Sequence, residues 1–64
     1  MIAAEIRRLR IMSGYSSYEK FANEHDIDRK QYWRIENGAN FTLKTLIKIL
    51  NAHNISFEDF FRNL

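Results

Sequence analysis

Residues 28–38, with the sequence DRKQYWRIENG, hold the side chains best suited to bind a charged ligand. Three cations, Arg29, Lys30 and Arg34, flank Trp33, and residues 29–34 carry no negative charge. Guanidinium and ammonium groups bind phosphates and the acceptor edge of guanine. Covering an indole ring with a ligand removes roughly 150–250 Å² of apolar surface from water. This combination suits an anionic ligand that also offers apolar surface. Duplex DNA is such a ligand, because it presents both phosphates and thymine methyl groups.

The direction of these side chains follows from helical periodicity. At about 100° per residue, the basic residues share an arc of roughly 140° with Trp33 and Asn37 on a helix that starts at Asp28. The opposite arc holds Gln31, Tyr32, Ile35 and Glu36. We therefore expect Tyr32 in the core and Trp33 in solvent. Basic helix faces with an exposed Trp also occur where nothing is bound, so this face alone does not assign a function.

Length and composition limit the class of protein. The 64 residues suffice for one domain, residues 1–64, which would hide only about 60% of the surface of its unfolded chain. The absence of cysteine excludes disulfides and thiolate metal sites. The N-terminus lacks the apolar run of a signal peptide, and no stretch approaches the ~18 apolar residues of a membrane span. We expect a cytoplasmic protein without a membrane segment.

No pattern in the chain predicts catalysis. His25 and His53 lie at the ends of different predicted helices, with no second ligand at metal-binding spacing. The sequence contains no glycine-rich phosphate loop, and no Ser, His and carboxylate set has a plausible cleft in so small a domain. We therefore expect no enzyme activity, no metal and no cofactor.

The apolar spacing is helical throughout and predicts an all-α fold of five short helices. The expected helices span about 3–13, 17–25, 28–37, 43–53 and 57–64. The second begins after Ser16 or Ser17, since either hydroxyl can cap it, with Glu19 completing a capping box for Ser16. The third begins at Asp28, which forms a capping box with Gln31.

The last two predicted helices carry apolar residues at helical spacing, and the last one is more apolar than a small core easily absorbs. One follows Thr42 and the other is capped by Ser56. Their i, i+3, i+4, i+7 positions hold Leu43, Leu46, Ile47 and Leu50, and then Phe57, Phe60, Phe61 and Leu64. Two interpretations of the last helix stay open: its four apolar residues close the core, or Phe57, Phe61 and Leu64 form a contact between two copies of the chain.

Six segments of the sequence follow one known pattern. They are IRRLR (6–10), Gly14, SYEKFA (17–22), IDRKQYWRIENG (27–38), TLKTLIKIL (42–50) and ISFEDFF (55–61). On these segments, residues 6–61 resemble the Xre/Cro-like helix-turn-helix family of phage and bacterial transcriptional regulators. The resemblance implies a compact five-helix lambda-repressor-like domain, with a recognition helix at about 29–37 in the major groove of double-stranded DNA.

Matched position by position, the resemblance implies which residues contact DNA. Base-reading residues are expected at Arg29, Lys30, Trp33 and Arg34. Phosphate contacts are expected from Ser17, Tyr18, Gln31, Asn37, Asn40 and Lys44. Arg10 and Glu36 match a partly buried ion pair that belongs to the fold. Such regulators commonly bind two-fold operators as homodimers, with half-sites about one helical turn apart.

Three departures from the family pattern bear on these expectations. The gap from Gly14 to Ala22 is one residue longer than usual, which leaves the cap of the second helix open. Tyr18 stands where the family most often has Gln, so a phenol hydroxyl replaces an amide at this contact. Asp26 replaces the usual turn glycine, and Asp tolerates a left-handed backbone better than most residues do.

Two other functions are weighed against DNA recognition. The basic face with Trp33 also suits an acidic protein partner, because Trp and Arg commonly anchor protein interfaces. As an antitoxin, the chain would instead hold a toxin through its last helix. Stacking of Tyr32 and Trp33 on single-stranded nucleic acid is disfavoured, since adjacent helix residues point about 100° apart. Saturable binding of duplex DNA without a protein partner separates DNA recognition from the protein-binding alternative.

Overall fold

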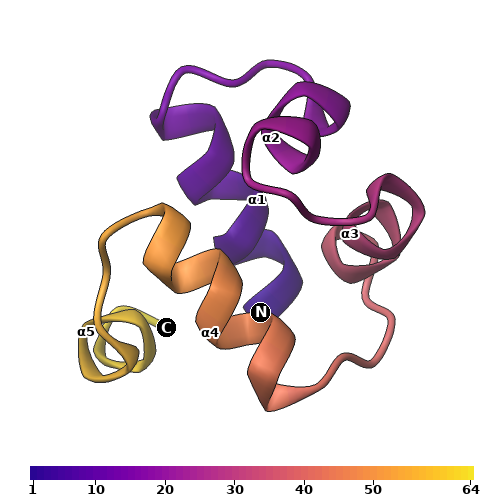
Figure 1. Cartoon of the computed structure of the whole chain (residues 1–64). Coiled ribbons are helices and arrows are strands. Elements are labelled where there is room, and N and C mark those ends of the chain that lie inside the picture. The colour runs from indigo at the N-terminus through magenta and orange to yellow at the C-terminus, as the bar shows by residue number, and fades with distance from the viewer.

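The computed structural model describes all 64 residues and contains five α-helices and no strands. The helices are α1 (Ile2–Met12), α2 (Tyr18–Glu24), α3 (Arg29–Glu36), α4 (Leu43–Ala52) and α5 (Phe57–Arg62). In Figure 1, α1 runs through the middle of the molecule, α3 lies at the right and α5 at the lower left. The predicted all-α class is confirmed, and each helix starts within one residue of its expected position.

Four of the helices begin at a side chain that accepts a hydrogen bond from a backbone N–H group. Ser17 accepts from Lys20, Asp28 from Gln31, Thr42 from Thr45 and Ser56 from Asp59. Such caps satisfy an N–H group that has no partner within the helix and typically contribute about 1 kcal/mol each. Of the two candidate caps for α2, the structure uses Ser17.

Each connection between helices turns at one residue with a positive φ angle. These residues are Gly14, Asp26, Gly38 and Asn54. Asp26, at φ 58°, adopts the left-handed conformation expected in the short turn between α2 and α3. Its carbonyl accepts a hydrogen bond from the Lys48 ammonium group of α4. The turn between α2 and α3 is therefore held by a neighbouring helix as well as by its own backbone.

The core is one cluster of eleven buried hydrophobic side chains. They are Ile6, Leu9, Phe21, Ala22, Ile27, Tyr32, Ile35, Leu46, Ile49, Leu50 and Phe60. Tyr32 is fully buried, whereas Trp33 is 48% exposed. The predicted division of these neighbouring rings between core and surface is therefore confirmed.

The apolar faces of α4 and α5 are narrower than their sequence spacing predicts. On α4 the buried residues are Leu46, Ile49 and Leu50, and this face leaves Leu43 and Ile47 at its edge, 58% and 44% exposed. Both residues belong to the i, i+3, i+4, i+7 series of α4, so part of that series lies outside the core. On α5, six residues long, only Phe60 is buried. The interpretation that all four apolar residues of the last helix close the core is wrong, because so short a helix turns only one side to the core.

The structure brings the two histidines together, which the sequence did not predict. Both contact Phe21: the His53 ring stacks on it with centroids 4.9 Å apart, and the His25 ring lies at 4.5 Å. The Ser13 hydroxyl donates to the Leu9 carbonyl and also lies 3.1 Å from Nδ1 of His53. Nδ1–H of His53 is therefore the donor to Ser13, and Nε2 carries no proton. Nε2 is buried without a hydrogen-bond partner.

Burial of His53 makes the stability of the domain depend on pH. Burial, and then the nearby His25, lowers the pKa of His53 from its usual value of 6.5. The folded domain favours neutral His53, while the unfolded chain takes up a proton as the pH falls through 6.5, so the free energy of unfolding decreases below that pH. We expect a lower melting temperature at about pH 5 than at about pH 7.5, measured by far-UV circular dichroism.

The matched variant is His53→Phe, which keeps an aromatic ring against Phe21 but cannot take up a proton. Its melting temperature is expected to change less over the same pH interval than that of the wild type. An equal change in the two proteins would show that His53 does not cause the pH dependence.

Candidate nucleic-acid interface

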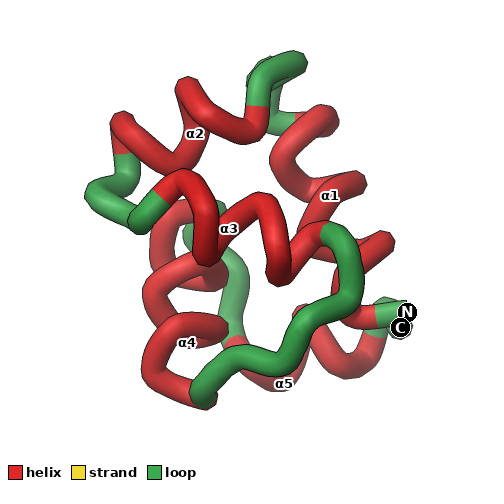
Figure 2. The backbone as a smooth tube through the Cα atoms, turned by 90° about the vertical axis from the view of Figure 1, so that its right-hand side faces the viewer, coloured by secondary structure: helices red, strands yellow, loops and turns green.

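The outer side of α3 carries the four residues expected to read bases. Arg29, Lys30, Trp33 and Arg34 are all exposed. The opposite side of the helix is fixed by Tyr32 and Ile35, which are 0% and 1% exposed. In Figure 2, α3 lies in front of the other helices and no element covers it. Its outer face is therefore open to a ligand, and its orientation is set by the core.

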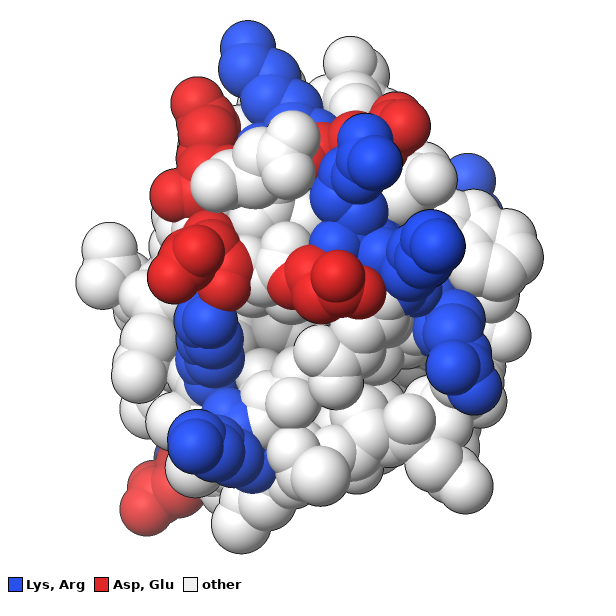
Figure 3. All heavy atoms as spheres, turned by 45° about the vertical axis from the view of Figure 1, so that its right-hand side comes forward, with Lys and Arg blue, Asp and Glu red and all other residues white.

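The ten Lys and Arg residues fall into two groups according to their partners. Arg8, Arg10 and Arg62 form ion pairs, and Lys48 donates to a backbone carbonyl. The remaining six are exposed and form no ion pair or side-chain hydrogen bond: Arg7, Lys20, Arg29, Lys30, Arg34 and Lys44. On the side of the molecule seen in Figure 3, Lys and Arg side chains form a row toward the right and a second group at the left, with acidic groups beside and between them. All three cations of α3 thus have free donors for an anionic ligand.

The residues expected to contact phosphate lie on three neighbouring segments. Gln31, Asn37, Asn40 and Lys44 are exposed, and Ser17 and Tyr18, at the start of α2, are half-buried. Two of them also serve the fold: the Ser17 hydroxyl oxygen caps α2, and Nδ2 of Asn37 donates to the Trp33 carbonyl at 2.8 Å. Asn37 keeps its second amide hydrogen, since only one is used in that bond.

A small cleft opens between the start of α2 and the outer face of α3. Its volume is about 290 Å³, and it is lined by Tyr18, Lys30, Trp33 and Arg34. Tyr18 packs partly against the core, whereas Trp33 is half exposed. The phenol ring is therefore a wall of the cleft that is held by the core, and the indole is a second wall that keeps about half of its contact with water.

An ion pair behind α3 attaches the end of this helix to α1. Nε of Arg10 donates to one carboxylate oxygen of Glu36 at 2.7 Å, and Nη2 donates to the other at 3.1 Å. Nη1 of Arg10 donates to the Tyr15 carbonyl at 2.8 Å. Both charged side chains are only 6% exposed. The hydrogen bond to Glu36 raises the pKa of Arg10, and burial, with the adjacent Glu36 carboxylate, raises the pKa of the Tyr32 phenol.

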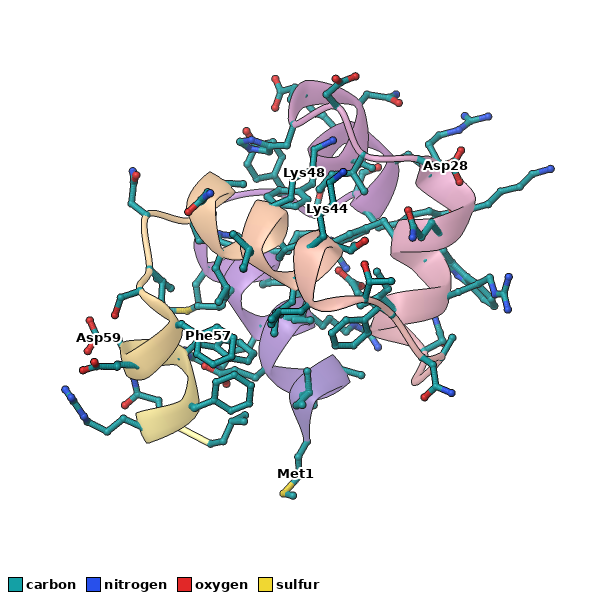
Figure 4. All side chains as sticks on the ribbon, turned by 60° about the horizontal axis from the view of Figure 1, so that its bottom comes forward. Met1, Asp28, Lys44, Lys48, Phe57 and Asp59 are labelled. Carbon is teal, nitrogen blue, oxygen red and sulfur yellow. The ribbon has the colours of Figure 1, made fainter.

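A second surface, apolar in character, lies on α4 and α5. Its groove of about 380 Å³ is lined by Leu43, Ile47, Leu50, Asn51, Ile55, Ser56 and Phe57. The Phe61 ring packs on Phe57 with centroids 4.7 Å apart, and Phe61 and Leu64 are 39% and 45% exposed. Figure 4 shows Phe57 on the side of α5 that faces the domain and Asp59 on the outer side. Of the three residues expected at a dimer contact, Phe57 lines this groove, Phe61 packs on Phe57, and Leu64 is exposed, so all three remain accessible.

The order of the helices and the open face of α3 define a helix-turn-helix domain. A family model described as "Helix-turn-helix" matches residues 6–60. The chain therefore belongs to the Xre/Cro-like helix-turn-helix family, a family of DNA-binding transcriptional regulators that are generally not enzymes. No match was found among curated proteins or among solved structures. None of the five helices is long and apolar enough to span a lipid bilayer.

Two features of the structure are not predicted from the sequence. The ring of Tyr18, expected at the phosphate backbone, lies beside Trp33, because the two residues meet only through the packing of α2 on α3. Lys48, for which the sequence predicts no role, donates to the turn carbonyl of Asp26. The available signal was the position of Lys48 one helical turn after Lys44, which puts both on one side of α4, as Figure 4 shows.

Proposed function

We propose that this chain is a sequence-specific regulator that binds double-stranded DNA with α3 in the major groove. Arg29, Lys30, Trp33 and Arg34 contact base edges in this proposal. Ser17, Tyr18, Gln31, Asn37, Asn40 and Lys44 contact phosphates on either side. The observation that carries the proposal is the set of exposed cations without partners on the outer face of a capped, core-anchored helix.

The dimensions and chemistry of α3 support this placement. Eight residues make a helix about 12 Å long, and the major groove is about 12 Å wide. An Arg side chain can donate two hydrogen bonds to O6 and N7 of guanine, which discriminates against the wrong base by about 1–3 kcal/mol. Lysine and asparagine at the flanks add the sequence-independent attraction to phosphates.

We further propose that two copies bind a two-fold operator through Phe57, Phe61 and Leu64. In Figure 1, α5 and α3 lie on opposite sides of the view, so a contact between two copies through α5 leaves α3 of each copy uncovered. The domain measures 27 × 24 × 18 Å. Two such domains side by side are together long enough to reach two half-sites about 34–36 Å apart.

A protein-binding role is the second candidate, and the apolar groove on α4 and α5 is the observation that favours it. The groove is lined mostly by apolar residues and is open to solvent, and exposed apolar surface rimmed by polar residues is where protein interfaces commonly form. In this proposal the chain is an antitoxin or another interaction module, with the groove holding a partner. Saturable binding of duplex DNA by the purified chain would separate the first candidate from a purely protein-binding one.

The primary experiment selects bound duplexes from a random pool and sequences them. We expect enrichment of one motif with two-fold symmetry, bound with an affinity that falls steeply as salt concentration rises. A pool that stays random after several rounds would refute sequence-specific binding. An enriched motif without symmetry would keep DNA recognition and remove the proposed two-fold assembly.

Arg34→Ala is expected to weaken binding to the selected duplex by about 1–3 kcal/mol and to relax the base preference at one position per half-site. Fluorescence anisotropy of labelled duplexes that differ at single base pairs measures both effects. Arg62→Ala is the matched control, because it also removes one exposed Arg but lies on α5, across the domain from α3 in Figure 1. If Arg34→Ala retains the affinity and the full base preference, the assignment of this face is wrong.

A further inference from the structure

The cleft between α2 and α3 opens on the proposed DNA-reading face, and its chemistry differs from that of the cations around it. Its two walls are aromatic rings, Tyr18 and Trp33, and Lys30 and Arg34 complete its lining. We propose that this cleft receives the 5-methyl group of a thymine in the major groove. This inference rests on the proposed function and names the base that the face selects.

The open shape of the cleft suits a group that projects from a larger ligand. Its volume is about 290 Å³, and it opens on the exposed face of α3. A methyl group on the edge of a base can enter such a cleft while the remainder of the base stays in its stack. The 5-methyl group of thymine is the apolar group that a base pair presents in the major groove.

The cations beside the cleft favour a methyl group that belongs to an anionic ligand such as DNA. Neither Lys30 nor Arg34 has an ion-pair or hydrogen-bond partner in the domain, so their charged ends remain available above the cleft. The methylene stems of such side chains can lie along apolar surface while their heads reach polar groups. A thymine next to a guanine satisfies the whole site, since guanine offers O6 and N7 to the cations.

Tyr18 thereby receives a role that differs from a phosphate contact. A phosphate contact depends on the phenol hydroxyl, whereas a wall of the cleft depends on the ring. The two roles separate in Tyr18→Phe, which removes the hydroxyl and keeps the ring. Trp33→Ala removes the other wall, and because Trp33 is half exposed, this variant is expected to keep its helical circular dichroism.

The test uses the duplex selected from the random pool, with each thymine replaced in turn by deoxyuridine, which lacks only the methyl group. We expect about 4-fold weaker binding at one thymine position per half-site, as for exposing one buried methyl group at about 0.8 kcal/mol. In Trp33→Ala the same pair of duplexes is expected to bind with equal affinity. In Tyr18→Phe the 4-fold difference is expected to remain.

Three outcomes would overturn the thymine assignment while DNA binding stands. Every thymine could tolerate deoxyuridine, the methyl effect could persist in Trp33→Ala, or Tyr18→Phe could abolish it. Failure to select any duplex would instead refute the proposed function, and the thymine assignment with it. The result on unmodified duplex therefore separates the two failures.

Discussion

Glu36→Ala is expected to destabilise the domain by about 3–5 kcal/mol, because it leaves the guanidinium of Arg10 buried without its counter-charge. Arg10 donates twice to Glu36, and both side chains are almost completely excluded from water. The lost free energy is mainly the cost of an unpaired buried charge. It exceeds the net contribution of the pair, since forming the pair also required both groups to leave water.

This loss is large for a domain of this size. Stabilities of about 0.05–0.15 kcal/mol per residue correspond to roughly 3–10 kcal/mol for 64 residues. Urea unfolding followed by circular dichroism should therefore show a variant that is marginal or unfolded without denaturant. Arg62→Ala is the control: its pairs with Glu58 and Asp59 are mostly exposed, and exposed pairs often contribute nothing measurable.

A paired replacement tests the cause of the loss. Arg10→Met combined with Glu36→Leu removes both charges and fills the space with apolar side chains, which is often neutral or stabilising for buried ion pairs. We expect the double variant to regain most of the stability that Glu36→Ala loses. The Tyr15 carbonyl loses its donor in this variant, so recovery should be incomplete. A double variant as unstable as Glu36→Ala, or a fully stable Glu36→Ala, would contradict the proposed cost of the unpaired charge.

The ion pair also affects the proposed function, because it holds the last residue of α3. Glu36 and Arg10 are separated by 26 positions in the sequence and join α3 to α1. A weakened connection would let α3 change its angle to the rest of the domain, and base-reading side chains depend on that angle. We therefore expect the double variant to fold but to discriminate less sharply between the selected duplex and its single-base variants.

The elements that the sequence predicted well were those fixed by local chemistry. Side-chain caps at Asp28 and Ser56 act within three residues, so they can be read from the chain directly. The inward direction of Tyr32 follows from the period of a single helix. The resemblance to a family supplied the long-range pairing of Arg10 with Glu36, which no local pattern contains.

The features that the sequence did not predict depend on how helices pack against one another. Leu43 and Ile47 have helical core spacing but lie at the edge of α4, because the contact with neighbouring helices is centred on Leu46 and Ile49. The Tyr18–Trp33 cleft likewise exists only because α2 packs on α3. Periodicity gives the side of a helix that is apolar, but not how much of that side another helix covers.

Incomplete coverage by neighbouring helices also leaves Phe61 on α5 exposed, and a charge at this position is expected to change operator binding strongly. Phe61→Asp is expected to weaken binding to a two-fold operator by roughly 10²–10⁴-fold, because the two half-sites would no longer be bound by linked domains. Phe61 is 39% exposed, so the variant is expected to fold. The Phe61 ring packs on Phe57. An Asp carboxylate in its place would be buried in the proposed dimer contact without a partner of opposite charge.

Two measurements distinguish a lost dimer from a damaged reading face. Binding to a single half-site should be unchanged in Phe61→Asp, since α3 is untouched, and sedimentation at micromolar concentration should show a dimer only for the wild type. Glu58→Gln is the matched control on α5, where its side chain is 86% exposed. If the wild type sediments as a monomer and Phe61→Asp binds the full operator equally well, the α5 contact is wrong. The apolar groove would then be available to a different protein, as in the second candidate function.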